Sequence, residues 1–452
     1  MKIIIAGDGK LGNILTSRLS SEGHDLTVID SSKNVIQTSI EQYDIMSVYG
    51  NCATSDTLMQ ADVKNTDLLI AVTGQDEVNL LSCMTAHGIN PNIHTIARIR
   101  NPEYTNQIYE MKNVFDISLA VNPEHQTAIE IERLLKYPGY LKRETFAKGR
   151  VEIVELRIDE NSKLCDVQLK DIYSITKCKI LVCVVLRDGK TVIPSGDFIL
   201  KKGDCIFVTA PSKTLTLLLK NLDIITRKTK TVTLCGGSKI TYYLAKLLIR
   251  DGISVQIIEK DKNRCKELSD LLPECDIIYG DASNETLLES EDVEDSDAIV
   301  SLTGLDELNI IISLYAKSQG IPQIITKLSR LNQIGVIDNL SLGSYVCPKE
   351  LCSNDIVRYV RAMKNQTGAA ISVHNIAGGQ AEALEFRADE TTKNCGVPLK
   401  DIKLRKEILI ACINSKGNMQ IPDGESCFQP GDTIIVVATG KHVIDQLNDI
   451  FE

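Results

Sequence analysis

The sequence of 452 residues predicts an α/β fold with two doubly wound parallel-sheet domains, each followed by a small α+β domain. Three observations support this. The chain repeats itself in one register, the first part of each repeat alternates strand-like and helix-like segments, and a glycine-rich turn follows the first strand-like segment. Strand–helix–strand order favours a parallel sheet that helices cover on both faces.

An internal duplication divides the chain into two halves. Thr73–Asn79 is matched by Thr303–Asn309 and Cys165–Ile172 by Cys395–Ile402, in each case about 230 residues later. Chance similarity would not keep one register over separate blocks. The repeat predicts two sheet domains, 1–136 and 229–365, and two small domains, 140–226 and 368–452, with joints rich in helix-breaking residues at Tyr137–Gly139 and Asn365–Gly368.

The first repeat shows the expected elements in order. The apolar segments predicted as strands are Lys2–Ala6, Asp25–Ile29, Ser47–Tyr49, Leu68–Val72 and His94–Ile99. The segments predicted as helices between them are Leu11–Ser20 and Glu77–His87. The small domain has predicted strands at Val151–Ile158, Ile180–Leu186 and Cys205–Ala210. We expect a helix to close each small domain.

Composition excludes several classes of protein. The chain carries 60 acidic against 50 basic residues, a net charge of −10, and this disfavours a nucleic-acid-binding surface. No apolar run approaches the roughly 20 residues that span a bilayer, and the N-terminus lacks the pattern of a secretory signal. We therefore expect a cytoplasmic protein.

Cysteine and histidine spacing gives no metal site. The 14 cysteines are scattered without a C-x-x-C pair, and the six histidines show no H-x-x-x-H spacing. We expect reduced thiols in a cytosolic fold.

The segment Gly7–Gly12 fits the pattern G-x-G-x-x-G, with Asp8, Lys10 and Leu11 between the glycines. It follows a predicted strand and opens a predicted helix, which is the context of a dinucleotide-binding turn in a Rossmann-like domain. Gly7 permits the tight turn, Gly9 lets the backbone approach a pyrophosphate, and Gly12 lets the helix pack closely on the sheet. The helix N-terminus would offer N–H groups to the phosphates.

Asp30 ends the second predicted strand at the spacing expected for the ribose-binding acid. An acid there favours NAD(H) or an adenine nucleotide over NADP. Thr73 and Gly74 follow another strand at its carboxyl end, and Asn51 and Cys52 could border the adenine. Arg98 either reaches the phosphates or forms a surface ion pair.

The second repeat carries a degenerate turn. Gly236, Gly237, Ser238, Lys239, Ile240 and Thr241 stand where Gly7 to Gly12 stand in the first repeat. Two of the signature glycines are lost, whereas Glu259 keeps an acid at the position of Asp30. The second turn either binds a nucleotide of lower affinity or different identity, or is empty and structural.

No catalytic centre is evident. A hydride-transfer enzyme needs a substrate pocket and usually an acid–base group near the nicotinamide. His125 is the only candidate, and the second repeat has Pro348–Glu350 in its place. A doubled binding unit without a catalytic centre indicates a sensor rather than an enzyme.

In combination, these motifs resemble the TrkA family, the cytosolic regulatory subunits of bacterial and archaeal Trk/Ktr-type potassium transporters. The resemblance covers nearly the whole chain, as two tandem RCK (KTN) units. The segments that carry it are Gly7–Gly12, Asp30, Ala71–Asn79, Ala97–Tyr104 and Gly280–Ser283.

The resemblance implies NAD(H) or ATP/ADP as ligand, assembly into a homo-oligomeric ring, and docking on a TrkH/TrkG-like potassium-conducting membrane subunit. It places the first site at Gly7, Asp8, Gly9, Lys10, Leu11, Asp30, Asn51, Cys52, Thr73, Gly74 and Arg98. It places the second site at Gly236, Gly237, Ser238, Lys239, Ile240, Glu259, Asp281, Thr303 and Lys327. The protein would then lie in the cytoplasm, at the membrane only through its partner.

Two alternatives to a potassium-transport regulator remain open from the sequence. One is an NAD-dependent oxidoreductase of unknown substrate. The other is a scaffold whose small domains, 145–225 and 370–450, bind a second messenger such as a cyclic dinucleotide.

Overall fold

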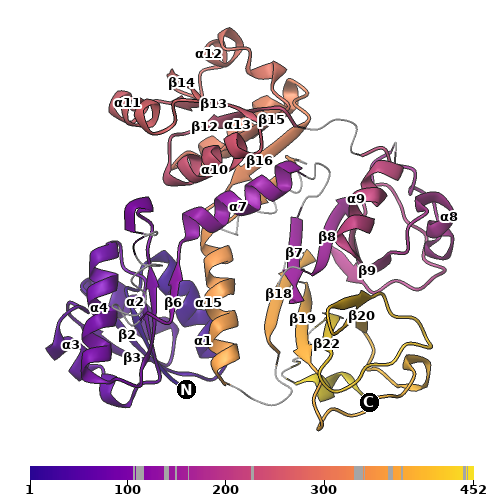
Figure 1. Ribbon diagram of the computed structural model, residues 1–452, viewed down its shortest axis with the longest axis horizontal. Coiled ribbons are helices and arrows are strands. Elements are labelled where there is room, and N and C mark those ends of the chain that lie inside the picture. Colours follow the sequence, from indigo (N-terminus) through magenta and orange to yellow (C-terminus); the bar gives the residue numbers. More distant parts are fainter. Residues whose placement is uncertain are drawn as a thin grey trace. The chain divides into compact units, whose positions relative to one another are not determined.

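The computed structural model describes most of the chain (Figure 1). The described residues are 1–104, 107, 117–136, 142–147, 150–160, 162–224, 229–329, 340, 342–364, 370–377, 380–440, 444 and 446–452. Both predicted joints, Tyr137–Gly139 and Asn365–Gly368, lie outside them.

The first lobe is a six-stranded parallel sheet in the order β3-β2-β1-β4-β5-β6. Its strands are β1 (Lys2–Ala6), β2 (Asp25–Asp30), β3 (Met46–Tyr49), β4 (Leu68–Ala71), β5 (His94–Arg98) and β6 (Leu119–Val121). Its helices are α1 (Lys10–Ser21), α2 (Lys33–Gln42), α3 (Ser55–Gln60), the 3₁₀ turn η1 (Val63–Asn65), α4 (Asp76–Ile89) and the start of α7 (Pro123–Lys136). This order confirms the predicted doubly wound fold.

The second lobe repeats this topology in the order β14-β13-β12-β15-β16-β17. Its strands are β12 (Thr231–Cys235), β13 (Ser254–Glu259), β14 (Asp276–Tyr279), β15 (Ala298–Ser301), β16 (Gln323–Lys327) and β17 (Ser344–Val346). Its helices are α10 (Lys239–Arg250), α11 (Lys262–Leu271), α12 (Glu285–Ser290), η4 (Val293–Asp295) and α13 (Asp306–Ser318), and α15 (Pro348–Lys364) follows β17. The edge strands β6 and β17 are not among the predicted strands, because they are three residues each and carry little periodic signal.

Each small domain is a five-stranded antiparallel sheet. The first contains β7 (Lys142–Phe146), β8 (Val151–Arg157), η3 (Leu169–Asp171), α8 (Ile172–Thr176), β9 (Leu181–Arg187), β10 (Lys190–Val192), β11 (Cys205–Ala210) and α9 (Ser212–Asn221). The second contains β18 (Ser372–Ile376), β19 (Ala381–Arg387), η7 (Leu399–Asp401), β20 (Ile408–Ser415), β21 (Asn418–Gln420), β22 (Thr433–Thr439) and η8 (Leu447–Ile450). The prediction of a closing helix is met by α9 in the first, but the described end of the second is only the short 3₁₀ turn η8.

The two small domains share one apolar core. Phe146, Val184 and Phe207 from the first pack in one cluster with Ala411 and Val437 from the second. These side chains lie on strands of both sheets, so the alternating apolar face of each sheet is buried against the other. Neither small domain therefore buries all of its apolar surface by itself.

By contact density the described residues form two compact units that do not follow the repeat boundary. The first unit is Met1–Ala128 with Cys347–Val360, and the second is Ile129–Val346 with Arg361–Glu452. The predicted boundaries at 136 and 229 follow the sequence repeat, whereas these units are defined by packing. The first small domain belongs to the second unit, and the helices α7 and α15 are each divided between the two units.

Helix α15 begins in the second repeat but packs on the first lobe, beside α1 (Figure 1). Arg18 on α1 forms an ion pair with Glu350 and donates to Asn354 Oδ1 at 2.6 Å. The first lobe is thus covered by a helix that the first repeat does not encode.

The C-terminal part of α7 packs on the second lobe in the same manner. The side chain of Gln323 donates to the carbonyl oxygen of Leu134 at 2.6 Å, and the hydroxyl of Thr229 donates to that of Leu135 at 3.0 Å. Lys136 forms an ion pair with Asp251 at 2.9 Å. The two hydrogen bonds satisfy the carbonyls of Leu134 and Leu135, which lie in the last turn of α7 and have no partner within the helix.

Over the part of the chain that the structure describes, no helix combines the length and apolarity needed to span a bilayer.

We expect Phe207→Ala to destabilise the second unit by about 3–5 kcal/mol, because it leaves a cavity in the core shared by the small domains. Urea unfolding followed by circular dichroism would measure this loss. The exposed Tyr173→Ala on α8 is the matched control and should change stability by less than about 0.5 kcal/mol. Equal unfolding midpoints for the two variants would contradict a shared core.

Candidate functional site

A cavity of about 810 Å³ lies at the carboxyl ends of the strands of the first lobe. Open α/β sheets bind ligands at this edge, where the strand order reverses. The lining residues are Gly7, Gly9, Lys10, Leu11, Ile29, Asp30, Ser31, Gly50, Asn51, Cys52, Val72, Thr73, Gly74, Gln75, Val78, Arg98, Pro123, Glu124, Pro348 and Lys349. All residues predicted for the first site except Asp8 are among them.

The glycine turn has the shape that the motif requires. Gly7 has φ of +94°, and a Cβ there would lie 2.8 Å from the Cα of Thr73. A Cβ on Gly12 would lie 2.1 Å from the carbonyl oxygen of Gly7. Gly9 is the N-cap of α1, faces open space and provides no side-chain cap, so the first N–H groups of the helix have no side-chain cap among the residues that the structure describes. Such a terminus attracts a phosphate.

Asp30 is held rigidly at the end of β2. Its Oδ2 accepts from the backbone N–H of Asp8 at 2.8 Å, and its Oδ1 accepts from that of Ser32 at 2.8 Å. Each carboxylate oxygen has a further lone pair. The carboxylate can therefore accept from ribose hydroxyls without losing its own support.

Asp8, also predicted for the first site, is not among the residues described as lining the cavity. Its side chain is only 4% exposed and points into the lobe, where it accepts from the hydroxyls of Thr16 and Ser39. Burial raises the pKa of the Asp8 carboxyl, and the two hydroxyl donors act in the opposite direction. The residue links α1, α2 and the glycine turn, so its role is to shape the turn.

Thr73 and Arg98 form the opposite wall through a shared hydrogen-bond network. The backbone N–H of Thr73 donates to Asn79 Oδ1 at 2.8 Å, and Arg98 Nη2 donates to the carbonyl oxygen of Thr73 at 2.7 Å. Desolvation, followed by the charge of Arg100, lowers the pKa of Arg98. Arg98 Nε is buried and has no hydrogen-bond partner among the described residues. An anionic ligand beside it would improve its electrostatic environment.

Two further wall segments come from the helices that begin at the cavity. Pro123 and Glu124 start α7, and Pro348 and Lys349 start α15 of the second repeat. Lys349 is not among the residues predicted for this site, because it lies far along the chain from the glycine turn and no local pattern connects the two. The match of Pro348 to Pro123 in the repeat register was the available clue.

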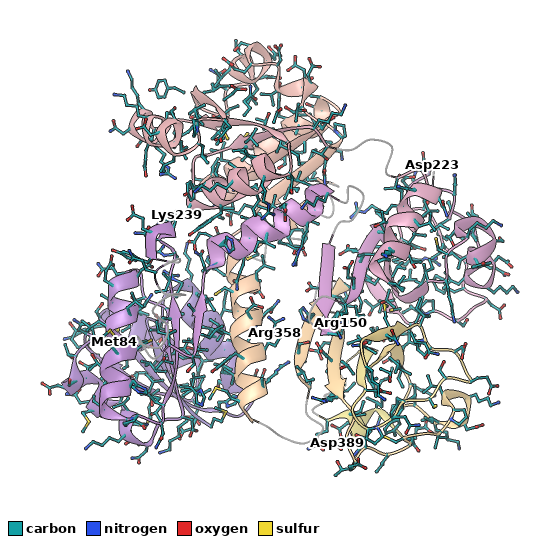
Figure 2. All side chains as sticks on the ribbon, viewed as in Figure 1. Met84, Arg150, Asp223, Lys239, Arg358 and Asp389 are labelled. Atoms are coloured by element: carbon teal, nitrogen blue, oxygen red, sulfur yellow. The ribbon has the colours of Figure 1, made fainter. Side chains whose placement is uncertain are left out.

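A second cavity of about 340 Å³ occupies the equivalent edge of the second lobe. Its lining residues are Gly236, Gly237, Ser238, Ile258, Glu259, Lys260, Gly280, Asp281, Ala282, Leu302, Thr303, Gly304, Leu305 and Leu308. Three residues predicted for the second site, Lys239, Ile240 and Lys327, are not among those described as lining it. Lys239, labelled in Figure 2, is the first residue of α10, and Lys327 Nζ donates to the carbonyl oxygen of Thr303 at 2.6 Å.

Among the described residues, no group of His, Cys, Asp and Glu side chains is arranged to hold a metal ion. His125, the one candidate acid–base residue, is not among the described residues that line the first cavity. Desolvation lowers the pKa of His125, as expected for a half-buried imidazole in the first turn of α7.

Two family models match the chain in tandem. The TrkA-N domain matches residues 3–123 and 232–348, and the TrkA-C domain matches residues 153–223 and 383–451. Each sheet lobe therefore corresponds to the first domain and each small domain to the second.

Relatives and solved structures agree with this division. A Trk system potassium uptake protein TrkA homolog from Methanosarcina mazei is 30% identical, over 96% of this chain and 97% of that protein. TrkA of Haemophilus influenzae is 29% identical, over 100% of this chain and 99% of its own. The GsuK RCK domain has a TM-score of 0.61 at 16% identity, covering 97% of this chain and 92% of that one, and the GsuK channel bound to NAD has a TM-score of 0.59 at 17% identity, covering 97% and 77%. The fold, the tandem domain matches and the full-length similarity together show that this chain belongs to the TrkA family of Trk system potassium uptake proteins.

Proposed function

We propose that this protein is the nucleotide-binding regulatory subunit of a Trk/Ktr-type potassium uptake system. Its first lobe would bind NAD(H) or ATP/ADP and so gate a separate TrkH/TrkG-like membrane subunit. The observation that carries the proposal is the first cavity, where an uncapped helix N-terminus and a supported carboxylate face the same space in a chain of this family.

Different residues of the first cavity would contact different parts of the ligand. The backbone of the turn at Gly9 would bind the diphosphate, Asp30 would accept from the ribose hydroxyls, and Arg98 would add a positive charge. NAD is compatible with this pattern because an acid at the ribose disfavours a 2′-phosphate. The GsuK channel solved with NAD and the GsuK structure with ADP share this fold.

Regulation would follow from linkage between ligand binding and shape. A ligand shifts a conformational equilibrium only by its different affinity for the two states. The first cavity is bordered by the starts of α7 and α15. A ligand bound there could therefore change the position of these two helices, which continue beyond the lobe. A coupling of about 1–3 kcal/mol would change the open fraction of a membrane partner by several-fold to a hundredfold.

Self-association is part of the proposal and is supported by a repeated apolar surface. Leu81 and Met84 on α4 are 52% and 41% exposed, and Ile311 and Leu314 at the equivalent positions of α13 are 56% and 39% exposed. Figure 2 labels Met84 on the first of these helices. Large apolar side chains exposed at the same positions in both repeats favour burial against further copies of the chain.

No specific observation favours the oxidoreductase alternative. The curated relatives are named as potassium uptake proteins, and the candidate acid–base residue His125 does not line the cavity. Oxidation of NADH by the purified protein in the presence of any of a panel of carbonyl compounds would favour the oxidoreductase instead.

Asp30→Ala should lower the affinity of the first lobe for NAD or ADP about tenfold, because a charged acceptor for the ribose hydroxyls is lost. Isothermal titration calorimetry measures the change. Asp25→Ala, at the opposite end of the same strand, is the control and should bind as the unaltered protein does. Unchanged affinity for Asp30→Ala would remove this residue from the site.

Potassium flux through the chain reconstituted with its membrane subunit should change several-fold on addition of saturating nucleotide. The Asp30→Ala variant should need a correspondingly higher nucleotide concentration for the same change. Equal flux with and without nucleotide, while calorimetry still detects binding, would contradict gating but leave the binding site intact.

Replacing Leu81 and Ile311 by Asp should weaken self-association, because a charge at the centre of an apolar contact must be desolvated. Light scattering would report a smaller assembly. The exposed Tyr173→Asp on α8 is a control outside this surface. An unchanged mass for the double variant would place the contact elsewhere.

A further inference from the structure

The acidic side of the second cavity has the same contacts as that of the first. Glu259 Oε2 accepts from the N–H of Gly237 at 2.5 Å, and its Oε1 accepts from that of Asp261 at 2.7 Å. These are the counterparts of the two backbone donors that hold Asp30 in the first lobe. The carboxylate therefore lies in the same supported position beside the cavity.

The neighbouring edges are also alike. Asp281 Oδ1 accepts from the N–H of Ser283 at 2.9 Å, as Asn51 Oδ1 accepts from that of Ala53 at 3.0 Å. The backbone N–H of Thr303 donates to Asn309 Oδ1 at 2.9 Å, which repeats the contact made by Thr73. The part of the second cavity that would face a ribose and a base is thus preserved.

The phosphate side is different, because two side chains have replaced glycines there. Ser238 Oγ accepts from the N–H of Thr241 at 3.3 Å, and Thr241 Oγ1 accepts from the N–H of Ser238 at 3.1 Å. The Thr241 hydroxyl also donates to the carbonyl oxygen of Gly236. This reciprocal capping box satisfies donors that the first lobe, with Gly9 and Gly12, leaves open.

A diphosphate would have to break this cap. Two of the cations nearby, Arg264 and Lys327, are engaged, whereas Lys260 lines the cavity next to Glu259, on its ribose side. Arg264 donates from Nε to the carbonyl oxygen of Gly237 at 2.7 Å and pairs with Glu267 at 2.7 Å. Lys327 is held by the carbonyl oxygen of Thr303. The cavity has less than half the volume of the first, and its described lining includes neither Lys239 nor Ile240. The space that remains suits a ligand without a phosphate chain.

We infer that the second cavity binds a nucleoside, recognised through its ribose by Glu259, and does not bind a diphosphate. The inference deepens the proposed function, because it assigns a ligand class to the second lobe. The two lobes would then recognise different chemical groups of the nucleotides and nucleosides in the cell. The first lobe recognises the diphosphate, and the second recognises the sugar and base alone.

Calorimetric stoichiometry on the full chain tests this directly, with adenosine, ADP and NAD as probes. We expect two adenosine molecules per chain but only one ADP or NAD. Glu259→Ala should reduce adenosine to one per chain and leave ADP at one. Asp261→Ala, whose backbone donor to Glu259 remains, is the matched acidic control and should keep two adenosine molecules.

The double variant Ser238→Gly with Thr241→Gly restores the glycines of the first lobe and should raise ADP to two per chain. If the double variant is unstable, the single variant Ser238→Gly, which removes half of the capping box, replaces it in the same titration. Circular dichroism checks that each variant is folded. Ser290→Gly, at the end of α12, controls for the added glycine.

The outcomes separate this inference from the proposed function. Two ADP molecules on the unaltered chain, or one adenosine that Glu259→Ala does not affect, would overturn the inference. No ADP binding at all, with adenosine binding that Glu259→Ala abolishes, would overturn the proposed function of the first lobe and leave the inference standing.

Discussion

The first lobe depends on one close approach, between the turn after β1 and the first turn of α1. A Cβ on Gly12 would lie 2.1 Å from the carbonyl oxygen of Gly7, well inside van der Waals contact. This contact brings the helix N-terminus over the carboxyl end of the sheet. The position of the cavity, the free N–H groups and the distance to Asp30 all follow from it.

In the second repeat, the position equivalent to Gly12 carries a side chain. Thr241 stands at the position of Gly12, and its hydroxyl becomes part of a cap with Ser238. The helix gains stability from this cap, by about 1 kcal/mol for a typical N-cap side chain. The same cap occupies N–H groups that would otherwise attract an anion, so under the proposed ligand assignment helix stability and phosphate binding compete for one set of N–H groups.

The long helices α7 and α15 link this local chemistry to the rest of the molecule. Each begins at the edge of the first cavity, and each is divided between the two compact units. The first lobe is covered in part by Glu350 and Asn354, which the second repeat encodes. The described lining of the first cavity therefore comes from both repeats.

Much of this protein is determined by local sequence. The duplication, the strand and helix periods, the glycine turn and the acids Asp30 and Glu259 are all visible without coordinates, because each depends on neighbours within a few residues or on a repeated register. The tertiary structure decided what depends on distant contacts. Asp8 lies in the motif, but its carboxylate is buried and accepts from the hydroxyls of Thr16 and Ser39, which lie on two different helices. Lys349 reaches the first cavity only because α15 packs on the first lobe, and no local pattern encodes a contact across more than half of the chain.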